Sequence, residues 1–470
     1  MVKPVFNHSS IMPQTRHQKK NQPGQQDNHN GDEANQPSDQ RSGGVALTDR
    51  SRKASATAKS SGPRSLFSTP TPQPSSSSSY NDLDFASIKG PPSTKASTKG
   101  QGTARPKSPI KHPIHLCRLE IEVNWADWVS AGKLSTIMNN AGSGDLYQSV
   151  VKATQGRFLP TELRSILEPM IGLRDDSDIL FAERPVRPFT QLQLHQAKLV
   201  QDPMSKSSGP PQLDNIPQSL SDAAHMQSLI FEFETLCLIN TMSIQHIQFW
   251  EGEASWNDDV HKSLLQLATQ HTPSVLPINI TRANIAKEFL PKASDFTSSV
   301  PTDSKIIDYA MVIRPEKDEK ITKKRFSNFC SRLGSQGFNQ SSYCPLQNWP
   351  SGVFIETKAY QNPVEAQIQL GIWLASWFNR VLKFPIPNPT PPPVLPVILV
   401  QNAAWDLWFA IDESTMENPK YELYGPVRIG ATDSILEVYR LLAALRVLAD
   451  WMATDFRDWV NTCLLKAGVF

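Results

Sequence analysis

Several features that mark common classes of protein are scarce or absent in this sequence of 470 residues. Its five cysteines form no Cys-x-x-Cys pair, and the last of its ten histidines is His271. Histidine-rich zinc sites and Ser-His hydrolase triads both need histidines, so neither is expected after residue 271. The sequence also contains no Gly-x-Gly-x-x-Gly and no Walker-type Gly-Lys-Ser/Thr loop, which excludes those phosphate-binding motifs.

A secretory signal peptide and a membrane-spanning segment are not expected either. The chain begins at Met1 without the apolar region of a secretory signal peptide. No run approaches the ~18 consecutive apolar residues that a membrane span requires. An odd number of cysteines in such a chain is typical of reduced thiols. We therefore expect a nuclear or cytoplasmic protein that is neither secreted nor inserted in a membrane.

Charge and composition divide the chain into two unlike parts. Residues 1–111 carry sixteen Lys or Arg and seven Asp or Glu, a net charge of +9, and the remaining residues carry 31 and 38, a net charge of −7. The first part is too poor in large apolar residues to offset the entropy of an ordered chain. We therefore predict a disordered, basic, low-complexity tail over residues 1–112. Its basic clusters, residues 50–53 and 105–111, are typical either of nuclear-import signals or of a solvated basic tail.

Hydrophobic periodicity predicts both strands and helices in the rest of the chain. Residues 117–124 alternate between apolar and polar side chains, as a half-buried strand does. Residues 200–220 are polar and proline-rich, which predicts a long loop. The seven prolines of residues 385–396 exclude a helix or a central strand there. Further strands are predicted over residues 305–313, 352–359, 397–400 and 405–411, and helices over residues 222–249, 251–268, 365–382 and 434–464.

The order of these elements predicts an α/β (α+β) domain, with a small mixed sheet flanked by helices. We place a helical N-terminal extension of this domain at residues 113–240. The core of the domain is expected at residues 241–470.

Three charged residues interrupt or end two of the predicted strands. Asp308 lies in one apolar run, and Glu356 and Lys358 lie two residues apart near the end of the next. Because side chains alternate across a strand, Glu356 and Lys358 point the same way. A charge in a buried strand is costly unless it is paired or bound to a metal. The pattern therefore indicates either a site for a hard cation, Mg²⁺ or Mn²⁺, or a solvated strand end with a surface ion pair.

The segments around these residues resemble the PD-(D/E)XK nuclease-like domain found in many fungal proteins. The resemblance rests on a helix with Trp-Asn and Val-His pairs at residues 256–261, the strand that contains Asp308, and Glu356-x-Lys358 with the Gln-rich helix behind it. The C-terminal residues 430–459 extend it. The residue before Asp308 is isoleucine instead of the proline of the family's name, at a position that varies in the superfamily. The resemblance implies a restriction-endonuclease-like core and a metal-dependent nuclease that hydrolyses phosphodiester bonds of DNA.

Carried over residue by residue, the resemblance assigns roles to individual side chains. Asp308 and Glu356 would be metal ligands, and Lys358 would be the catalytic lysine that orients or helps to deprotonate the attacking water. The implied cofactor is Mg²⁺ or Mn²⁺, and the implied partner is nucleic acid, DNA before RNA. The supporting residues are Thr357, a ligand through its carbonyl, Glu253, an acid of the first core helix, and Gln367 on the helix after the second strand, with Gln369 the second choice.

Other interpretations stay open at this point. A basic cluster in the polar stretch 314–350 would either contact phosphates or belong to a solvated loop. The acidic balance of the folded part favours a catalytically inactive nuclease-fold binding or interaction protein. A nuclease that acts on foreign or competing genomes is a third interpretation, and the sequence does not define the oligomeric state. The residues of the basic cluster are Lys320, Lys323, Lys324 and Arg325.

Overall fold

The structure, a computed structural model, gives positions for most of the chain after residue 109. It describes residues 110–127, 134–139, 142–172, 177–183, 218–295, 298–314, 320–333, 337–347, 349–360, 362–415 and 417–468. These residues belong to one compact unit, Lys99–Phe470. Most of the predicted tail and of the predicted loop at residues 200–220 lies outside the described residues, so both stay predictions. No helix in the described ranges has the length and apolar character that a membrane crossing requires.

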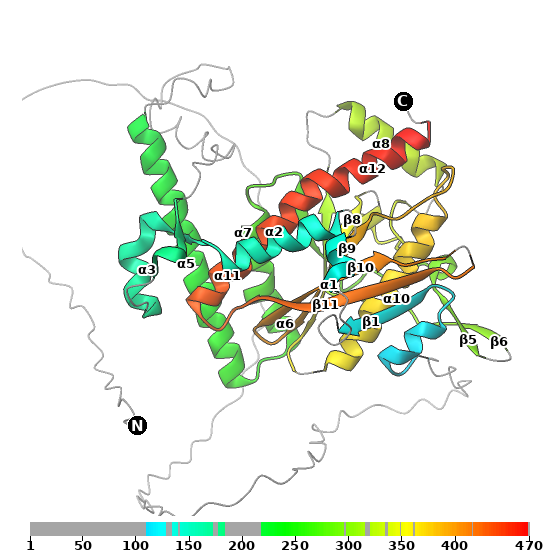
Figure 1. Cartoon of the computed structure of the whole chain (residues 1–470), viewed down its shortest axis with the longest axis horizontal. Coiled ribbons are helices and arrows are strands. Elements are labelled where there is room, and N and C mark those ends of the chain that lie inside the picture. The colour runs from blue at the N-terminus through cyan, green and yellow to red at the C-terminus, as the bar shows by residue number, and fades with distance from the viewer. Residues whose placement is uncertain are drawn as a thin grey trace, which may run out of the picture. The chain divides into compact units, whose positions relative to one another are not determined.

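A seven-stranded mixed sheet forms the centre of the unit (Figure 1). The β1–β11 and β8–β9 pairs are parallel, and the other neighbouring strands are antiparallel. The prediction of a mixed sheet within an α/β fold is therefore confirmed. In sheet order the strands are β1 (Glu122–Asp127), β11 (Lys420–Ala431), β10 (Ala404–Asp412), β9 (Val394–Gln401), β8 (Ser351–Lys358), β7 (Tyr309–Ile313) and β4 (Val275–Asn279).

Helices cover both faces of this sheet. Phe354 of β8 packs on Trp373 of α10, and Phe409 of β10 packs on Tyr147 of α2, on the opposite face. Helix α11 contacts α2, α5 and α7 on the face of the sheet that α2 covers. The helices that build these layers are α2 (Ser143–Gln155), α5 (Gln218–Phe249), α7 (Lys262–Thr269), α10 (Pro363–Leu382), α11 (Ile435–Trp451) and α12 (Arg457–Lys466).

The remaining elements are short. Two small sheets pair β2 (Leu159–Pro160) with β3 (Phe181–Ala182) and β5 (Lys292–Asp295) with β6 (Ser298–Pro301). Other helices and turns are η1 (Pro113–Arg118), α1 (Leu134–Asn139), η2 (Thr161–Leu163), α3 (Arg164–Ile171), η3 (Ser177–Ile179), α6 (Glu253–Ser255), η5 (Trp256–His261), η6 (Lys287–Phe289), α8 (Lys320–Arg332), α9 (Cys344–Gln347) and η8 (Met452–Phe456).

The predicted helices are confirmed, and two of them contain a π-helical turn that the periodicity does not reveal. The stretch over residues 251–268 consists of α6, the π turn η5 and α7. The C-terminal stretch consists of α11, the π turn η8 and α12. A π turn inserts one residue into the helical repeat, and such turns are frequent at functional sites.

The first strand begins later than the alternation predicts. Pro113 starts a 3-10 helix that runs through residue 118, with His112 as its capping residue, and the strand β1 begins only at Glu122. A proline at the first helical position is favourable because its missing N–H has no intrahelical partner to lose. Ile121 and Val123 are nevertheless buried, as the alternation predicts.

The prediction that residues 385–396 contain no central strand is wrong at its end. Strand β9 begins at Val394 and contains Pro396, although it lies between β8 and β10. The proline is tolerated because β9 pairs with β8 only from Val397 onward. The strands β4 and β11, which the periodicity does not predict, contain Pro277 and Pro426 respectively.

Candidate functional site

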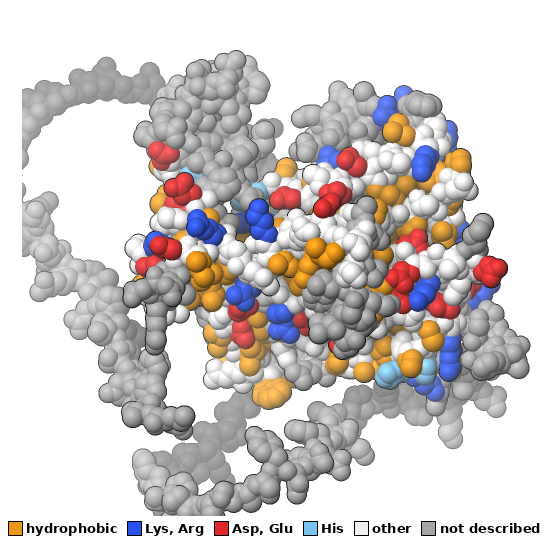
Figure 2. All heavy atoms as spheres, in the orientation of Figure 1, with side chains coloured by type: hydrophobic (Ala, Val, Ile, Leu, Met, Phe, Trp, Pro, Cys, Tyr) orange, Lys and Arg blue, Asp and Glu red, His pale blue; other side chains and the backbone are white. Residues whose placement is uncertain are grey.

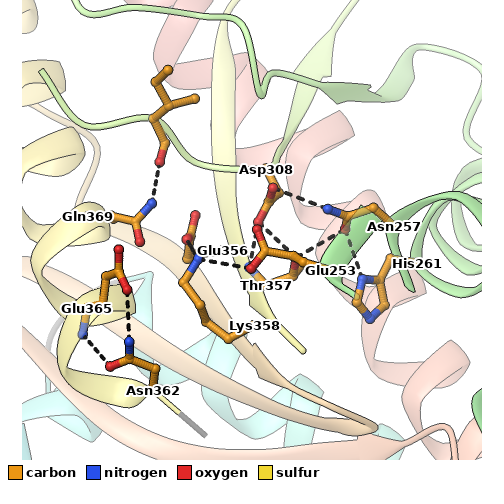
Figure 3. Close-up of polar contacts among 11 residues, drawn as sticks. Glu253, Asn257, His261, Asp308, Glu356, Thr357, Lys358, Asn362, Glu365 and Gln369 are labelled. Carbon is orange, nitrogen blue, oxygen red and sulfur yellow. Dashed lines mark hydrogen bonds and ion pairs between the residues drawn. The ribbon is translucent and has the colours of Figure 1, made fainter. Parts of the chain in front are cut away.

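The three charged residues singled out in the sequence meet at one edge of β7 and β8 (Figure 3). Asp308 directly precedes β7, and Glu356 and Lys358 lie at the end of β8. The two strands are antiparallel, with Tyr309 opposite Ile355, so Asp308 reaches the end of β8. Seven of the eight residues of β8 are buried, which holds the acids inside the protein.

Asp308 is fixed by hydrogen bonds to both of its carboxylate oxygens. Oδ2 accepts from the backbone N–H of Thr357 at 2.9 Å and lies 2.8 Å from the Thr357 hydroxyl, and Oδ1 accepts from Asn257 Nδ2 at 3.2 Å. Burial raises the pKa of Asp308, although the hydrogen bonds from Thr357 act in the opposite direction. Thr357 therefore contacts the acid through its own N–H and hydroxyl, whereas its predicted role used the carbonyl.

Lys358 lies between two other carboxylates. Its Nζ is 2.5 Å from Glu356 Oε1 and 3.3 Å from Glu253 Oε2. The side chain of Glu356 is only 1% exposed, whereas that of Glu253 is 41% exposed. Burial, and then the charge of Asp308, raises the pKa of Glu356 well above its ordinary value despite the nearby ammonium. Burial alone would lower the pKa of Lys358, but Glu356, Glu253 and Asp308 together outweigh burial, and the pKa of Lys358 is raised.

A second layer of side chains behind these residues was not assigned any role from the sequence. Asn257 Oδ1 lies 3.1 Å from the Thr357 hydroxyl and 3.0 Å from His261 Nδ1, and its backbone carbonyl accepts from the Tyr309 hydroxyl at 2.7 Å. Asn257 and His261 both belong to the π turn η5 and are buried. Their four-residue spacing places them on one side of the turn, and both belong to the Trp-Asn and Val-His pairs on which the family resemblance rests.

His261 gives this layer a pH dependence that can be measured. Burial lowers the pKa of His261 to about 3, against an ordinary value of 6.5, so its ring is neutral in the folded protein. Below pH 6.5 the unfolded chain binds a proton that the folded protein does not bind, and stability falls by about 1.4 kcal/mol per pH unit.

We predict that His261→Gln removes this loss. Glutamine keeps a donor for Asn257 but does not titrate. As the pH falls from 6.5 to 5, the unfolding free energy of the wild type should drop by about 2 kcal/mol more than that of the variant. Urea unfolding at both pH values measures the difference. An equal pH dependence in both proteins would contradict a neutral, buried His261.

Gln369, and not Gln367, contacts the chain next to Asp308. Gln369 Nε2 donates to the carbonyl of Ile306 at 2.8 Å (Figure 3). The two glutamines are two positions apart on α10, which turns their side chains about 200° away from each other. The contact therefore favours Gln369 as the supporting residue, and the role of Gln367 stays a prediction.

The basic cluster lies on a helix. Residues 320–325 begin α8, whereas the solvated alternative for this stretch was a loop. Lys324 is exposed and Arg325 is partly buried. None of the polar contacts described around Asp308, Glu356 and Lys358 comes from α8, so a role of this cluster in phosphate binding stays a prediction.

The carboxylate oxygens of the site are donors that suit a hard cation. Within the described ranges, no three His, Cys, Asp or Glu side chains converge closely enough to hold a metal ion. A Mg²⁺ ion needs only one or two carboxylates, because it keeps several of its waters. Glu356 Oε2 is buried without a hydrogen-bond partner, close to the second buried carboxylate of Asp308. A cation at these two acids would supply the counter-charge that Lys358 supplies only in part.

The fold and this site define a nuclease-like α/β protein with an acid, acid, lysine set at the ends of two neighbouring strands. The chain belongs to the PD-(D/E)XK nuclease superfamily, whose family model matches residues 203–457, more than half of the chain. No curated protein and no solved structure matches the chain. PD-(D/E)XK nucleases generally use divalent metals, and membership supports a nuclease-like function.

Proposed function

We propose that the protein is a metal-dependent nuclease that hydrolyses phosphodiester bonds of DNA. The observation that carries the proposal is the convergence of Asp308, Glu356 and Lys358 at the ends of β7 and β8. Burial raises the pKa of both carboxylates, so their charges are costly to the fold, and groups with such perturbed pKa values cluster at functional sites. The predicted nuclear or cytoplasmic location stays a prediction.

Asp308 and Glu356 would hold Mg²⁺ or Mn²⁺ in this proposal. The bound ion would supply Lewis-acid polarisation of the scissile phosphate and a water of lowered pKa. Thr357 and Asn257 fix both oxygens of Asp308, so that this acid needs little reorganisation when a ligand binds. Glu253 is the second carboxylate that contacts the Lys358 ammonium, and this contact restricts where the ammonium can point.

Lys358 acts as a cation in this proposal. Its ammonium is held by Glu356 and Glu253, which keep it protonated, so it suits the stabilisation of negative charge and the orientation of a water better than proton abstraction. The sequence predicts that Lys358 either orients or helps to deprotonate the attacking water, and the proposal keeps the orienting role.

Cleavage of DNA by the purified full-length chain tests the proposal. Supercoiled plasmid, linear duplex and single-stranded DNA are incubated with Mg²⁺ or Mn²⁺, and with EDTA. We expect cleavage only with metal, and a loss of at least about 100-fold in Asp308→Ala. Asp406→Ala is the matched control, because Asp406 is a strand acid that pairs with Arg428 on β11, outside the site.

Circular dichroism confirms that both variants are folded. A folded wild-type protein that neither cleaves any of these DNAs nor binds either metal would instead support the catalytically inactive alternative. Metal binding is measured by calorimetry, so the two outcomes are separable. Cleavage that persists in EDTA would contradict the metal dependence.

A further inference from the structure

Two exposed aromatic side chains flank the candidate site in the chain. Trp250 lies three residues before Glu253 and is 75% exposed, and Tyr360 lies two residues after Lys358 and is 50% exposed. Their rings are stacked, with centroids 6.2 Å apart and an angle of 17° between the ring planes. The Tyr360 hydroxyl donates to the backbone carbonyl of Trp250 at 2.7 Å. The pair therefore joins the segment leading to Glu253 with the segment leaving Lys358.

Trp250 occupies a position where folding alone would favour glycine. It follows the last residue of α5 with a φ of 55°, in the left-handed region, and the Glu251 N–H donates to the carbonyl of His246 at 3.1 Å. This is the C-terminal capping arrangement in which glycine is usual, because a side chain is strained at such a φ. A bulky ring at this position is costly, and its exposure shows that burial does not repay the cost. Strained backbone of this kind concentrates at functional sites.

The surface around the pair is apolar at the end of α5. Phe249 is also exposed, at 64%. Figure 2 shows hydrophobic side chains on the molecular surface at the lower end of the protein, where the end of α5 lies in Figure 1. Flat aromatic rings that face solvent stack on nucleobases, whose π-faces are sequence-independent, and each such contact contributes markedly to the binding of single strands.

We propose that the Trp250–Tyr360 pair binds an unstacked nucleobase of single-stranded nucleic acid beside the candidate active site. This inference rests on the proposed nuclease function and adds to it the form of the substrate. The neighbouring Glu251 and Glu253 are acidic, so the aromatic pair supplies base contact and not phosphate attraction. A divalent cation is therefore needed in the binding assay to offset the repulsion between these acids and the phosphates.

The test is binding of labelled single strands to the full-length chain, followed by fluorescence anisotropy in Ca²⁺. Three strands of about twelve nucleotides are compared: thymidine DNA, uridine RNA, and an abasic DNA that keeps the phosphates and lacks the bases. Trp250→Ala and Tyr360→Ala should each weaken binding of a strand with bases by roughly 5- to 100-fold, with no change for the abasic strand. The comparison of thymidine and uridine strands identifies whether the Trp250–Tyr360 pair prefers DNA or RNA.

Three further variants separate base binding from folding. Trp250→Gly should weaken binding while the melting temperature stays the same or rises, because glycine suits the left-handed φ. Tyr360→Phe keeps the ring and should bind within about threefold of the wild type. Phe231→Ala removes another exposed aromatic ring of α5, 18 residues before the helix end or about 27 Å along its axis, and should leave binding unchanged.

The outcomes distinguish this inference from the proposed function. If the protein does not cleave but shows base-dependent binding that Trp250→Ala abolishes, the result would support base binding by the Trp250–Tyr360 pair and contradict the proposed nuclease function. If the protein cleaves, and wild type and Trp250→Ala bind the strands equally, the result would contradict base binding by the pair and support the nuclease function. Base binding by the pair would also be contradicted if Trp250→Ala weakened the binding of thymidine and abasic strands equally, or if the wild type bound no strand.

Discussion

Replacement of Lys358 by alanine is expected to reduce metal-dependent cleavage by about 100- to 10,000-fold and to destabilise the metal-free protein by about 3 kcal/mol. The ammonium lies 2.5 Å from Glu356 Oε1, and the Glu356 side chain is only 1% exposed. Without it, two buried acids, Glu356 and Asp308, lose the cation that lowers the pKa of each. Cleavage rates with Mg²⁺ or Mn²⁺ and urea unfolding in EDTA measure the two effects.

A second lysine of the sheet provides the matched control. Lys420 Nζ lies 2.6 Å from Glu422 Oε1 on β11, so Lys420→Ala breaks another Lys–Glu pair with two-residue spacing on a strand. This variant should cleave within about twofold of the wild type. The double variant Lys358→Met with Glu356→Gln removes both charges and should recover stability but not cleavage. Wild-type cleavage by the folded double variant would contradict the proposed role of Lys358.

The charged part of the site follows from the sequence because local rules govern it. The two-residue period of a strand places Glu356 and Lys358 on the same side, and the structure has their charged groups in contact. The acid in the preceding apolar run reaches the same place because β7 and β8 are neighbours and antiparallel. Strand period and adjacency of consecutive strands are both readable from one sequence.

The second layer behind the acids does not follow from local rules. Thr357 and Asn257 meet across 100 positions of the sequence, through the packing of the π turn η5 against the end of β8. The helical period over residues 251–268 predicts Asn257 on the same face as Trp256 and Val260, and all three are buried, but the period does not show that Asn257 meets Thr357. The choice between Gln367 and Gln369 likewise depends on how α10 is rotated against the sheet.

Proline makes β9 look shorter in the sequence than it is, because the prolines of residues 385–396 argue against a central strand there. The sequence rule removes proline from central strands, yet β9 and β11 both contain it and both lie inside the sheet. In β9 the proline precedes the residues that pair with β8. Which backbone N–H groups need a partner is decided by the register between strands, and the register depends on tertiary packing.

Glu356→Gln is expected to have the opposite effect on stability from Lys358→Ala. Burial and the charge of Asp308 raise the pKa of the Glu356 carboxyl although Lys358 lowers it, so the charge of Glu356 opposes folding at neutral pH. Glutamine keeps an oxygen for Lys358 and removes the repulsion with Asp308. We expect the metal-free variant to be more stable by about 1 to 3 kcal/mol at pH 7, and to lose cleavage.

The pH dependence of this gain has a definite sign. As the pH falls through the raised pKa of Glu356 toward the ordinary value of 4.5, the folded wild type takes up a proton that the unfolded chain does not. The wild type therefore gains stability over this window, and its deficit relative to Glu356→Gln should shrink. Urea unfolding in EDTA at pH 7 and pH 5 measures the change, and a constant difference would contradict a raised pKa.

Metal provides the complementary measurement on the same pair of proteins. An ion that binds only the folded state at 100 times its dissociation constant stabilises that state by about 2.7 kcal/mol, so Mg²⁺ or Mn²⁺ should raise the melting temperature of the wild type. Glu356→Gln should lose most of this rise, because it removes one of the two proposed ligands, whereas Glu422→Gln in the β11 pair should retain it. A full metal-induced rise in Glu356→Gln would place the ion elsewhere. Higher stability without metal, together with lost metal response and lost cleavage, is the combination that a functional acid produces and a structural ion pair does not.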